Sequence, residues 1–116
     1  NTFRVCTVFN GNINNWDVSG VATLFAFLFS ANSFTGALDN WDIGNVLFLG
    51  FFANGATITT LNYDALLVSW EGQTPNSGLT NVNFGNSQYS LGSAAATARA
   101  SLVSTYNWTI TDGGGI

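Results

Sequence analysis

A repeat of 25 residues is the feature that most constrains the fold of this chain. A shift of the first segment by 25 positions places Trp16 on Trp41 and Asp17 on Asp42, and it places apolar residues on apolar residues. The apolar pairs include Phe9/Phe34, Ile13/Leu38, Val18/Ile43, Val21/Val46, Leu24/Leu49 and Phe27/Phe52. A unit this short cannot bury its own apolar face, so successive units must pack against one another.

The pattern inside each unit predicts an α/β solenoid. Residues 13–18 and 38–43 have the pattern of a short strand with a turn, and residues 21–29 and 46–53 that of one or two helical turns. We expect four pairs to form inward ladders between the coils: Ile13/Leu38, Val18/Ile43, Val21/Val46 and Leu24/Leu49.

The period ends after Thr57, and the remaining pattern predicts helices and strands of a different kind. Apolar residues at helical spacing predict a short helix, with Asn62 or Thr60 as its N-cap and Gly72 just past its end: Tyr63, Leu66, Leu67 and Trp70. Residues 73–80 predict a loop, residues 82–84 a strand, residues 93–106 a helix capped by Ser93, and residues 108–111 a second strand. Asn107 suits the left-handed backbone that often ends a helix.

These patterns predict one structural domain made of a repeat array and a cap. The array comprises a partial coil at residues 1–8 and coils at 9–33 and 34–57, and the C-terminal capping segment covers 58–116. Because the chain starts inside a repeat, we expect its first complete coil to offer an uncovered apolar end that another chain can contact.

Charge and composition exclude several classes of function. Two Lys or Arg against six Asp or Glu give a net charge of −4, which disfavours nucleic-acid binding. The absence of histidine removes the commonest general base and metal ligand, so we predict no enzyme, no catalytic residues and no cofactor or metal. Cys6 is the single cysteine and cannot form an internal disulfide. The apolar stretches are also too short to span a membrane as a helix, which takes about 20 residues.

The repeat motif resembles a known family. The segments from Phe9 to Val21 and from Phe34 to Val46, each with a Trp-Asp-Val/Ile core, are similar to the FNxxIxxWDVSNVxxM repeat of BspA-like leucine-rich-repeat proteins of bacterial surfaces. Residues 62–70 and 94–112 resemble the segment that ends such arrays. The resemblance implies leucine-rich-repeat-like stacked coils, a secreted or surface location, a role in adhesion or assembly, and no catalytic residues.

The chain departs from the family where polar residues commonly stand between the inward positions. Five bulky apolar residues occupy those places: Phe25, Phe29, Leu47, Phe48 and Phe51. Helical geometry turns them away from the inward residues, so we predict an apolar face that drives association with other copies or other surface proteins.

The repeat-defining residues allow more than one interpretation. Trp16 and Trp41 suit either inter-coil packing or an aromatic platform for sugar rings. Asp17 and Asp42 suit either hydrogen bonds within their own turns or a shared Ca²⁺. The other acidic residues, Asp39, Asp64, Glu71 and Asp112, have no spacing that identifies a glycosidase pair.

Together these observations predict a noncatalytic extracellular or cell-surface repeat protein. Its expected role is adhesion or self-assembly, such as a filament or surface-layer subunit. The alternative hypothesis is a carbohydrate-binding module that uses Trp16 and Trp41.

Overall fold

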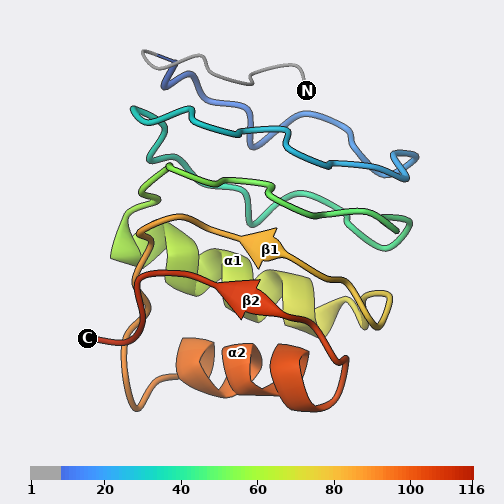
Figure 1. The fold of residues 1–116 in the computed structure, drawn as a ribbon, viewed down its shortest axis with the longest axis vertical. Coiled ribbons are helices and arrows are strands. Elements are labelled where there is room, and N and C mark those ends of the chain that lie inside the picture. Colours follow the sequence, from blue (N-terminus) through green and yellow to red (C-terminus); the bar gives the residue numbers. More distant parts are fainter. Residues whose placement is uncertain (1–8) are drawn as a thin grey trace.

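Regular secondary structure lies in the C-terminal half of the chain (Figure 1). The computed structural model describes residues 9–116, so the predicted partial coil at 1–8, with Cys6, lies outside the described residues. The elements are helix α1 (Thr60–Gly72), strand β1 (Val82–Asn83), helix α2 (Ala94–Ser104) and strand β2 (Ile110–Thr111). From residue 9 to residue 59 the backbone forms turns, bends and isolated bridges, without a helix or strand.

The predicted α/β solenoid, with its leucine-rich-repeat-like stacked coils, is wrong. The molecule is a compact globule of 33 × 31 × 24 Å, and its described part has two helices and one sheet of two short strands. The strands predicted at 13–18 and 38–43 and the helical turns predicted at 21–29 and 46–53 do not form. Ala26 and Phe51 have left-handed backbone, which interrupts the predicted helical turns at 21–29 and 46–53 and prevents a run of regular φ and ψ angles there.

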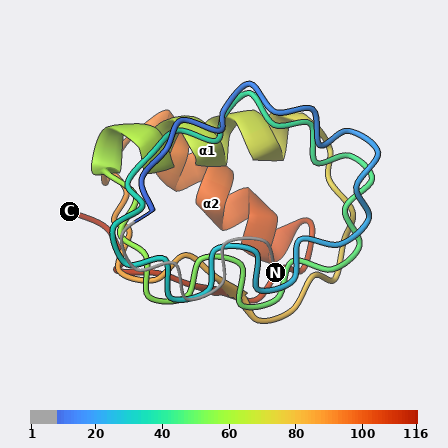
Figure 2. The same ribbon diagram turned by 90° about the horizontal axis from the view of Figure 1, so that it is seen from above.

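The two repeats lie side by side in the register that the sequence indicates. Backbone N–H groups of the first donate to carbonyls of the second, with N···O distances of 2.8, 2.9 and 2.7 Å: Leu24 to Phe48, Ala26 to Gly50 and Leu28 to Phe52. The chain continues this layering beyond the repeats, since Phe51 donates to Asn81 and Val82 donates to Thr109. Seen from above, these segments follow nearly the same outline (Figure 2).

The layered segments form one side of the molecule, which we call the front face. It consists of residues 22–30, 47–55, 79–85 and 109–115, and it includes β1 and β2, which pair in parallel with Val82 opposite Ile110. Helix α1 lies on the opposite side, and α2 lies at the end farthest from the first repeat (Figures 1 and 2). The front face and the α1 side are therefore separate surfaces.

One continuous apolar core joins the repeats to the C-terminal half. Seven of the eight ladder residues are buried, while Val21 is half-buried. The Phe52 ring lies at the centre of the core, with its centroid 6.2 Å from that of Trp41, 5.8 Å from Trp70 and 6.2 Å from Phe84. Because this core crosses residue 58 without a break, the separate capping role of residues 58–116 stays a prediction.

The N-cap of helix α1 lies one residue before the nearer of the two predicted caps. Thr59 is the N-cap, and its side-chain oxygen accepts a hydrogen bond from the N–H of Asn62 at 3.3 Å. The assignment of Asn62 or Thr60 as N-cap is therefore wrong, because the threonine before the first turn takes that position. The predicted apolar stripe is confirmed as the buried face of α1. The placement of Gly72 just past the end is wrong, because the helix includes Gly72 and Gln73 is its C-cap.

The second helix begins where the sequence predicts. Ser93 is the N-cap of α2, and its hydroxyl accepts from the N–H of Ala96 at 3.4 Å. The helix ends at Ser104, two residues before the predicted end, and Asn107 has the expected left-handed backbone with φ 58°. Strands β1 and β2 are shorter than predicted but lie in the predicted segments.

Candidate functional site

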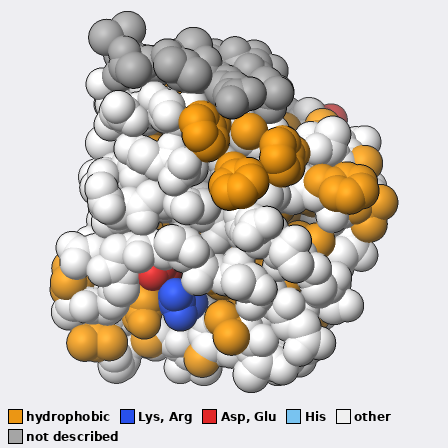
Figure 3. Space-filling model, in the orientation of Figure 1, with side chains coloured by type: hydrophobic (Ala, Val, Ile, Leu, Met, Phe, Trp, Pro, Cys, Tyr) orange, Lys and Arg blue, Asp and Glu red, His pale blue; other side chains and the backbone are white. Residues whose placement is uncertain are grey.

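Bulky apolar side chains gather in one group on the front face (Figure 3). Of the five residues predicted to form an apolar face, four are exposed: Phe48 by 61%, Leu47 by 54%, Phe25 by 48% and Phe51 by 38%. Phe29 is half-buried beside them. The structure thus brings the candidate assembly residues together on one surface.

The backbone of this apolar face has an uncommon conformation. Ala26, Ser30 and Phe51 have φ of 53°, 57° and 53°, a left-handed region that costs non-glycine residues about 1 kcal/mol or more. Each N–H donates to the next layer, with Ala26 bonded to Gly50 at 2.9 Å, Ser30 to Asn54 at 2.6 Å and Phe51 to Asn81 at 2.7 Å. These hydrogen bonds hold the strained turns in place, so the exposure of the rings follows from turns and not from the predicted helix.

Two neighbouring hollows lie between these side chains. One of about 410 Å³ is lined by Phe25, Ala26, Phe29, Phe51 and Asn54. The other, of about 210 Å³, lies between Phe25, Phe48 and the segment around Leu79. The Phe51 ring meets Phe25 edge-on at a centroid distance of 5.7 Å and Phe29 at 6.5 Å. No charged residue lines either hollow. The larger is lined mainly by apolar side chains, with Asn54 at its edge, whereas Thr80 and Asn81 also line the smaller.

The two repeat-defining tryptophans lie in different environments. Trp41 is fully buried, and its indole N–H donates to the carbonyl of Ile13 at 2.8 Å. Trp16 is 45% exposed. A sugar platform made by both rings is therefore wrong, since only Trp16 reaches solvent, whereas the packing interpretation holds for Trp41.

The repeat-defining aspartates hold the turns of their own repeats. Asp17 Oδ1 accepts from the N–H of Ser19 at 3.0 Å and from its hydroxyl at 2.6 Å, and Asp42 Oδ1 accepts from the N–H of Gly44 at 2.9 Å. The hydroxyl and the N–H of Ser19 lower the pKa of Asp17. The interpretation of these residues as turn-forming is confirmed, and the shared Ca²⁺ is not needed to explain them.

Asp112 is the centre of a half-buried cluster of charged and polar side chains near the C-terminal end. It accepts from Arg99 Nε at 2.7 Å and Nη2 at 3.2 Å, and from the hydroxyl of Tyr63 at 2.5 Å. Burial raises the pKa of Asp112, but the hydrogen bonds of Arg99, Tyr63 and the Gly114 N–H outweigh it and keep that pKa below its usual value. Burial and the Asp112 hydrogen bond raise the pKa of Tyr63. The cluster links α1 to α2 and the end of the chain.

The other acidic residues also bind distant parts of the chain. Asp39 accepts from the amide of Asn14 at 2.9 Å, Asp64 from the hydroxyl of Ser90 at 2.7 Å, and Glu71 from the hydroxyl of Ser101 at 3.0 Å. These partners give each carboxylate a structural role. They do not require a catalytic pair.

A second set of polar residues on the α1 side was not singled out from the sequence. Asn15 and Asn40 are equivalent in the two repeats, and their exposed side-chain amides make no hydrogen bond within the described residues. They line a hollow of about 450 Å³ together with Trp16, Asp17 and Asp42. The sequence feature that could have indicated this set is the presence of asparagine at equivalent positions of the two repeats, Asn15 and Asn40.

Two general findings bear on metals and membranes. Among residues 9–116, no three or more Cys, Asp or Glu side chains come together as a metal-binding group. No helix in this part of the chain has the length and apolar character needed to cross a bilayer.

The repeat region identifies the family. Residues 1–78 match the family model described as Mycoplasma protein of unknown function, DUF285. The chain belongs to this family. Searches of the curated proteins and of the solved structures gave no match.

Proposed function

We propose that this member of the DUF285 family is a noncatalytic extracellular or cell-surface protein that self-associates through its front apolar face. The family match over residues 1–78 and the repeated Trp-Asp-Val/Ile core are compatible with the BspA-like surface proteins that the motif resembles. Assembly on a surface, as a filament or layer, or adhesion to another surface protein, would use the same face.

The exposed apolar face is the observation that carries this proposal. Soluble monomers rarely expose a contiguous group of large apolar side chains, and such groups usually mark an interface. Here four of the five candidate residues are at least 38% exposed, and they are adjacent on one side of the molecule. Burying each ring against a partner would contribute about 1.5–3 kcal/mol before the costs of association.

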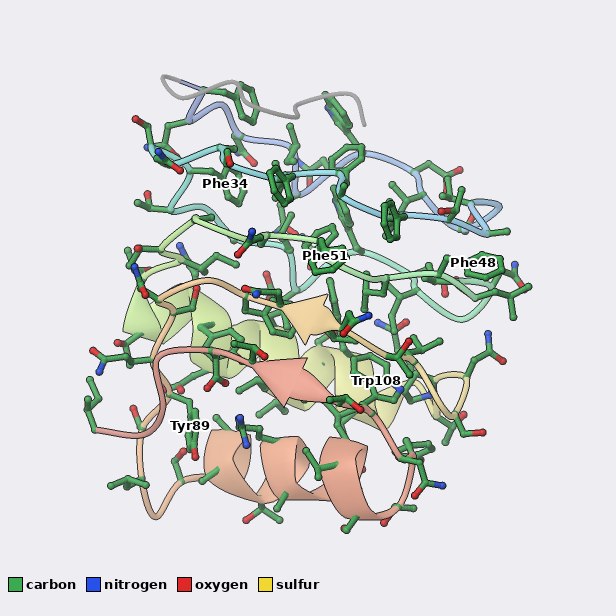
Figure 4. All side chains as sticks on the ribbon, viewed as in Figure 1. Phe34, Phe48, Phe51, Tyr89 and Trp108 are labelled. Carbon is green, nitrogen blue, oxygen red and sulfur yellow. The ribbon has the colours of Figure 1, made fainter. Side chains whose placement is uncertain are left out.

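The shape and charge of the face favour a second copy of the same chain. Phe48 is the most exposed of the five and lies on the same segment as Phe51, whose ring lines the larger hollow (Figure 4). A projecting ring and an apolar hollow on one face can serve as the two halves of a self-complementary contact. A face without charges also needs no partner of opposite charge.

Sedimentation velocity of the native chain over a range of concentrations tests the proposal. We expect the wild type to form species larger than a monomer and Phe48→Ser to lose them, with weaker losses for Phe25→Ser, Phe29→Ser and Phe51→Ser. Leu61→Ser is the matched control, because Leu61 is 80% exposed on α1, away from the front face. A wild type that stays monomeric, or a loss that Leu61→Ser reproduces, would contradict the proposal.

A further inference from the structure

The α1 side of the molecule carries a polar groove that the assembly proposal does not use. The hollow of about 450 Å³ that contains Trp16 shares Asn14 and Asn15 with a second hollow of about 360 Å³. The second hollow continues between Asn10 and Thr35. The two hollows are therefore neighbours along the first and second repeats, and we call them together the groove.

The groove lies away from the front face. Segment 35–41 forms its lower wall, and this segment is bonded to α1, since Asn62 donates to the carbonyl of Thr35 at 3.0 Å and Ser69 to that of Asp39 at 2.6 Å. The segments of the front face lie on the side of the molecule opposite α1 (Figure 2). A ligand in the groove would leave that face uncovered.

The polar groups of the groove suit hydroxyl groups. The amides of Asn15 and Asn40 can each donate and accept, and neither has a hydrogen bond within the described residues. Asp17 and Asp42 each use Oδ1 for their own turn, and no bond within the described residues uses the second oxygen of either carboxylate. A sugar hydroxyl both donates and accepts, so this mixture of amides and carboxylates can pair with several hydroxyls.

Trp16 adds an apolar surface to these polar groups. Trp16 is 45% exposed and lines the hollow together with Asn15 and Asp17. The C–H face of a sugar ring is flat and apolar, and an exposed indole offers a matching surface. A few convergent polar groups around an aromatic wall are the usual make-up of a small-ligand site.

The same residues argue against other ligands. No Lys or Arg lines either hollow, so an anion would find no counter-charge. The net charge of −4 opposes a nucleic acid. We propose that the groove binds a neutral oligosaccharide, with Trp16 stacked on one sugar ring and Asn15, Asn40 and Asp17 bonded to its hydroxyls.

Tryptophan fluorescence provides a direct readout of this site. Trp41 and Trp70 are fully buried and Trp108 is 2% exposed, so Trp16 is the one tryptophan of the four that solvent quenchers reach. We would titrate the native chain separately with cellohexaose, maltohexaose and chitohexaose. We expect one of them to shift the emission and to protect Trp16 from acrylamide quenching.

Variants distinguish a built site from a chance contact. Calorimetry should show affinity for the active probe at least about tenfold lower in Trp16→Ala and in Asn15→Ala, with an intermediate loss in Trp16→Phe. Asn86→Ala is the matched control, since Asn86 is an exposed asparagine that lines neither hollow, and it should bind like wild type. If Trp16→Ala does not fold, Asn15→Ala carries the test, because the side chain of Asn15 has no hydrogen bond within the described residues.

Sugar binding in the groove should not depend on self-association through the front face. Phe48→Ser should retain sugar binding even if it abolishes larger species. No binding by any of the three probes at about 10 mM, or equal binding by Trp16→Ala and wild type, would overturn the inference.

Discussion

The first and second repeats have the same sequence pattern but different surroundings. Trp16 and Trp41 occupy the same position of the Trp-Asp-Val/Ile core, yet Trp16 is 45% exposed and Trp41 is fully buried. The second repeat lies between the first repeat on one side and residues 79–85 and α1 on the other. The burial of a repeat residue thus depends on which segments pack against its repeat, and not on its position in the motif alone.

The hydrogen bonds of the two indoles show how this difference arises. Trp41 donates to the carbonyl of Ile13 in the first repeat, and Trp70 of α1 donates to the carbonyl of Leu38 in the second. In both cases, the indole therefore bonds to the backbone of the segment that precedes its own in the packing order. The helix α1 continues a packing relation that the repeats begin, although its backbone is different. Side-chain packing, more than secondary structure, connects the two halves.

The largest expected effect is the difference in stability between variants of Trp41 and of Trp16. Trp41→Ala should lower the free energy of unfolding by about 3–5 kcal/mol, because it leaves a large cavity in the core and removes the hydrogen bond to Ile13. Trp16→Ala should lower it by no more than about 1 kcal/mol. Urea unfolding followed by circular dichroism measures both. Trp41→Phe keeps most of the ring and should lie between them, whereas equal effects of the two alanine variants would contradict the comparison.

The sequence predicts local features of the fold well where the signal is local. The apolar stripe of α1 and the Ser93 cap of α2 come from residues within a few positions of each other. The 25-residue period also predicts which residues of the two repeats are neighbours, as the parallel bridge between Thr23 and Phe48 shows. These features depend on residue types at a fixed spacing, and both can be read directly from a sequence.

The fold class and the sites depend on contacts that spacing does not record. Nothing in the motif indicates that Ala26 and Phe51 take left-handed conformations, and these interrupt the helical turns that the apolar pattern favours. The partners of Asp112 lie 13 and 49 residues away, in Arg99 and Tyr63. The exposed amides of Asn15 and Asn40 become a candidate site only once the repeats lie side by side.

A second prediction extends the comparison from tryptophans to acidic residues. The side chain of Asp112 is 2% exposed and paired with Arg99, so Asp112→Asn should lower the free energy of unfolding at neutral pH by about 1.5–3 kcal/mol. The folded pKa of Asp112 is depressed, so its contribution is complete above the unfolded pKa of about 3.9 and is lost as the pH falls through the folded value.

Urea unfolding at several pH values measures this contribution. Wild type should lose stability below about pH 4, and Asp112→Asn should lose less over the same range because it has no carboxylate to protonate there. Tyr63→Phe, which removes one hydrogen bond and keeps the ion pair, should retain the acid dependence in weaker form. Parallel pH curves for wild type and Asp112→Asn would show that the cluster does not stabilise the fold.

The smallest expected effect concerns the repeat-equivalent aspartates, which share one turn hydrogen bond, while Asp17 also accepts from the Ser19 hydroxyl. Asp17 and Asp42 are both exposed, and each accepts a hydrogen bond from the N–H two residues ahead, at 3.0 and 2.9 Å. Asp42→Ala should lower the free energy of unfolding by no more than about 1 kcal/mol, as is usual for an exposed turn. Asp17→Ala should shift the urea midpoint at least as far as Asp42→Ala does, because Asp17 loses the Ser19 hydroxyl bond as well as the turn bond. If Asp42→Ala were clearly more destabilising than Asp17→Ala, the turns of the second repeat would also depend on the layers packed beside it. The difference between Trp16 and Trp41 would then be a property of the whole repeats and not of these two positions.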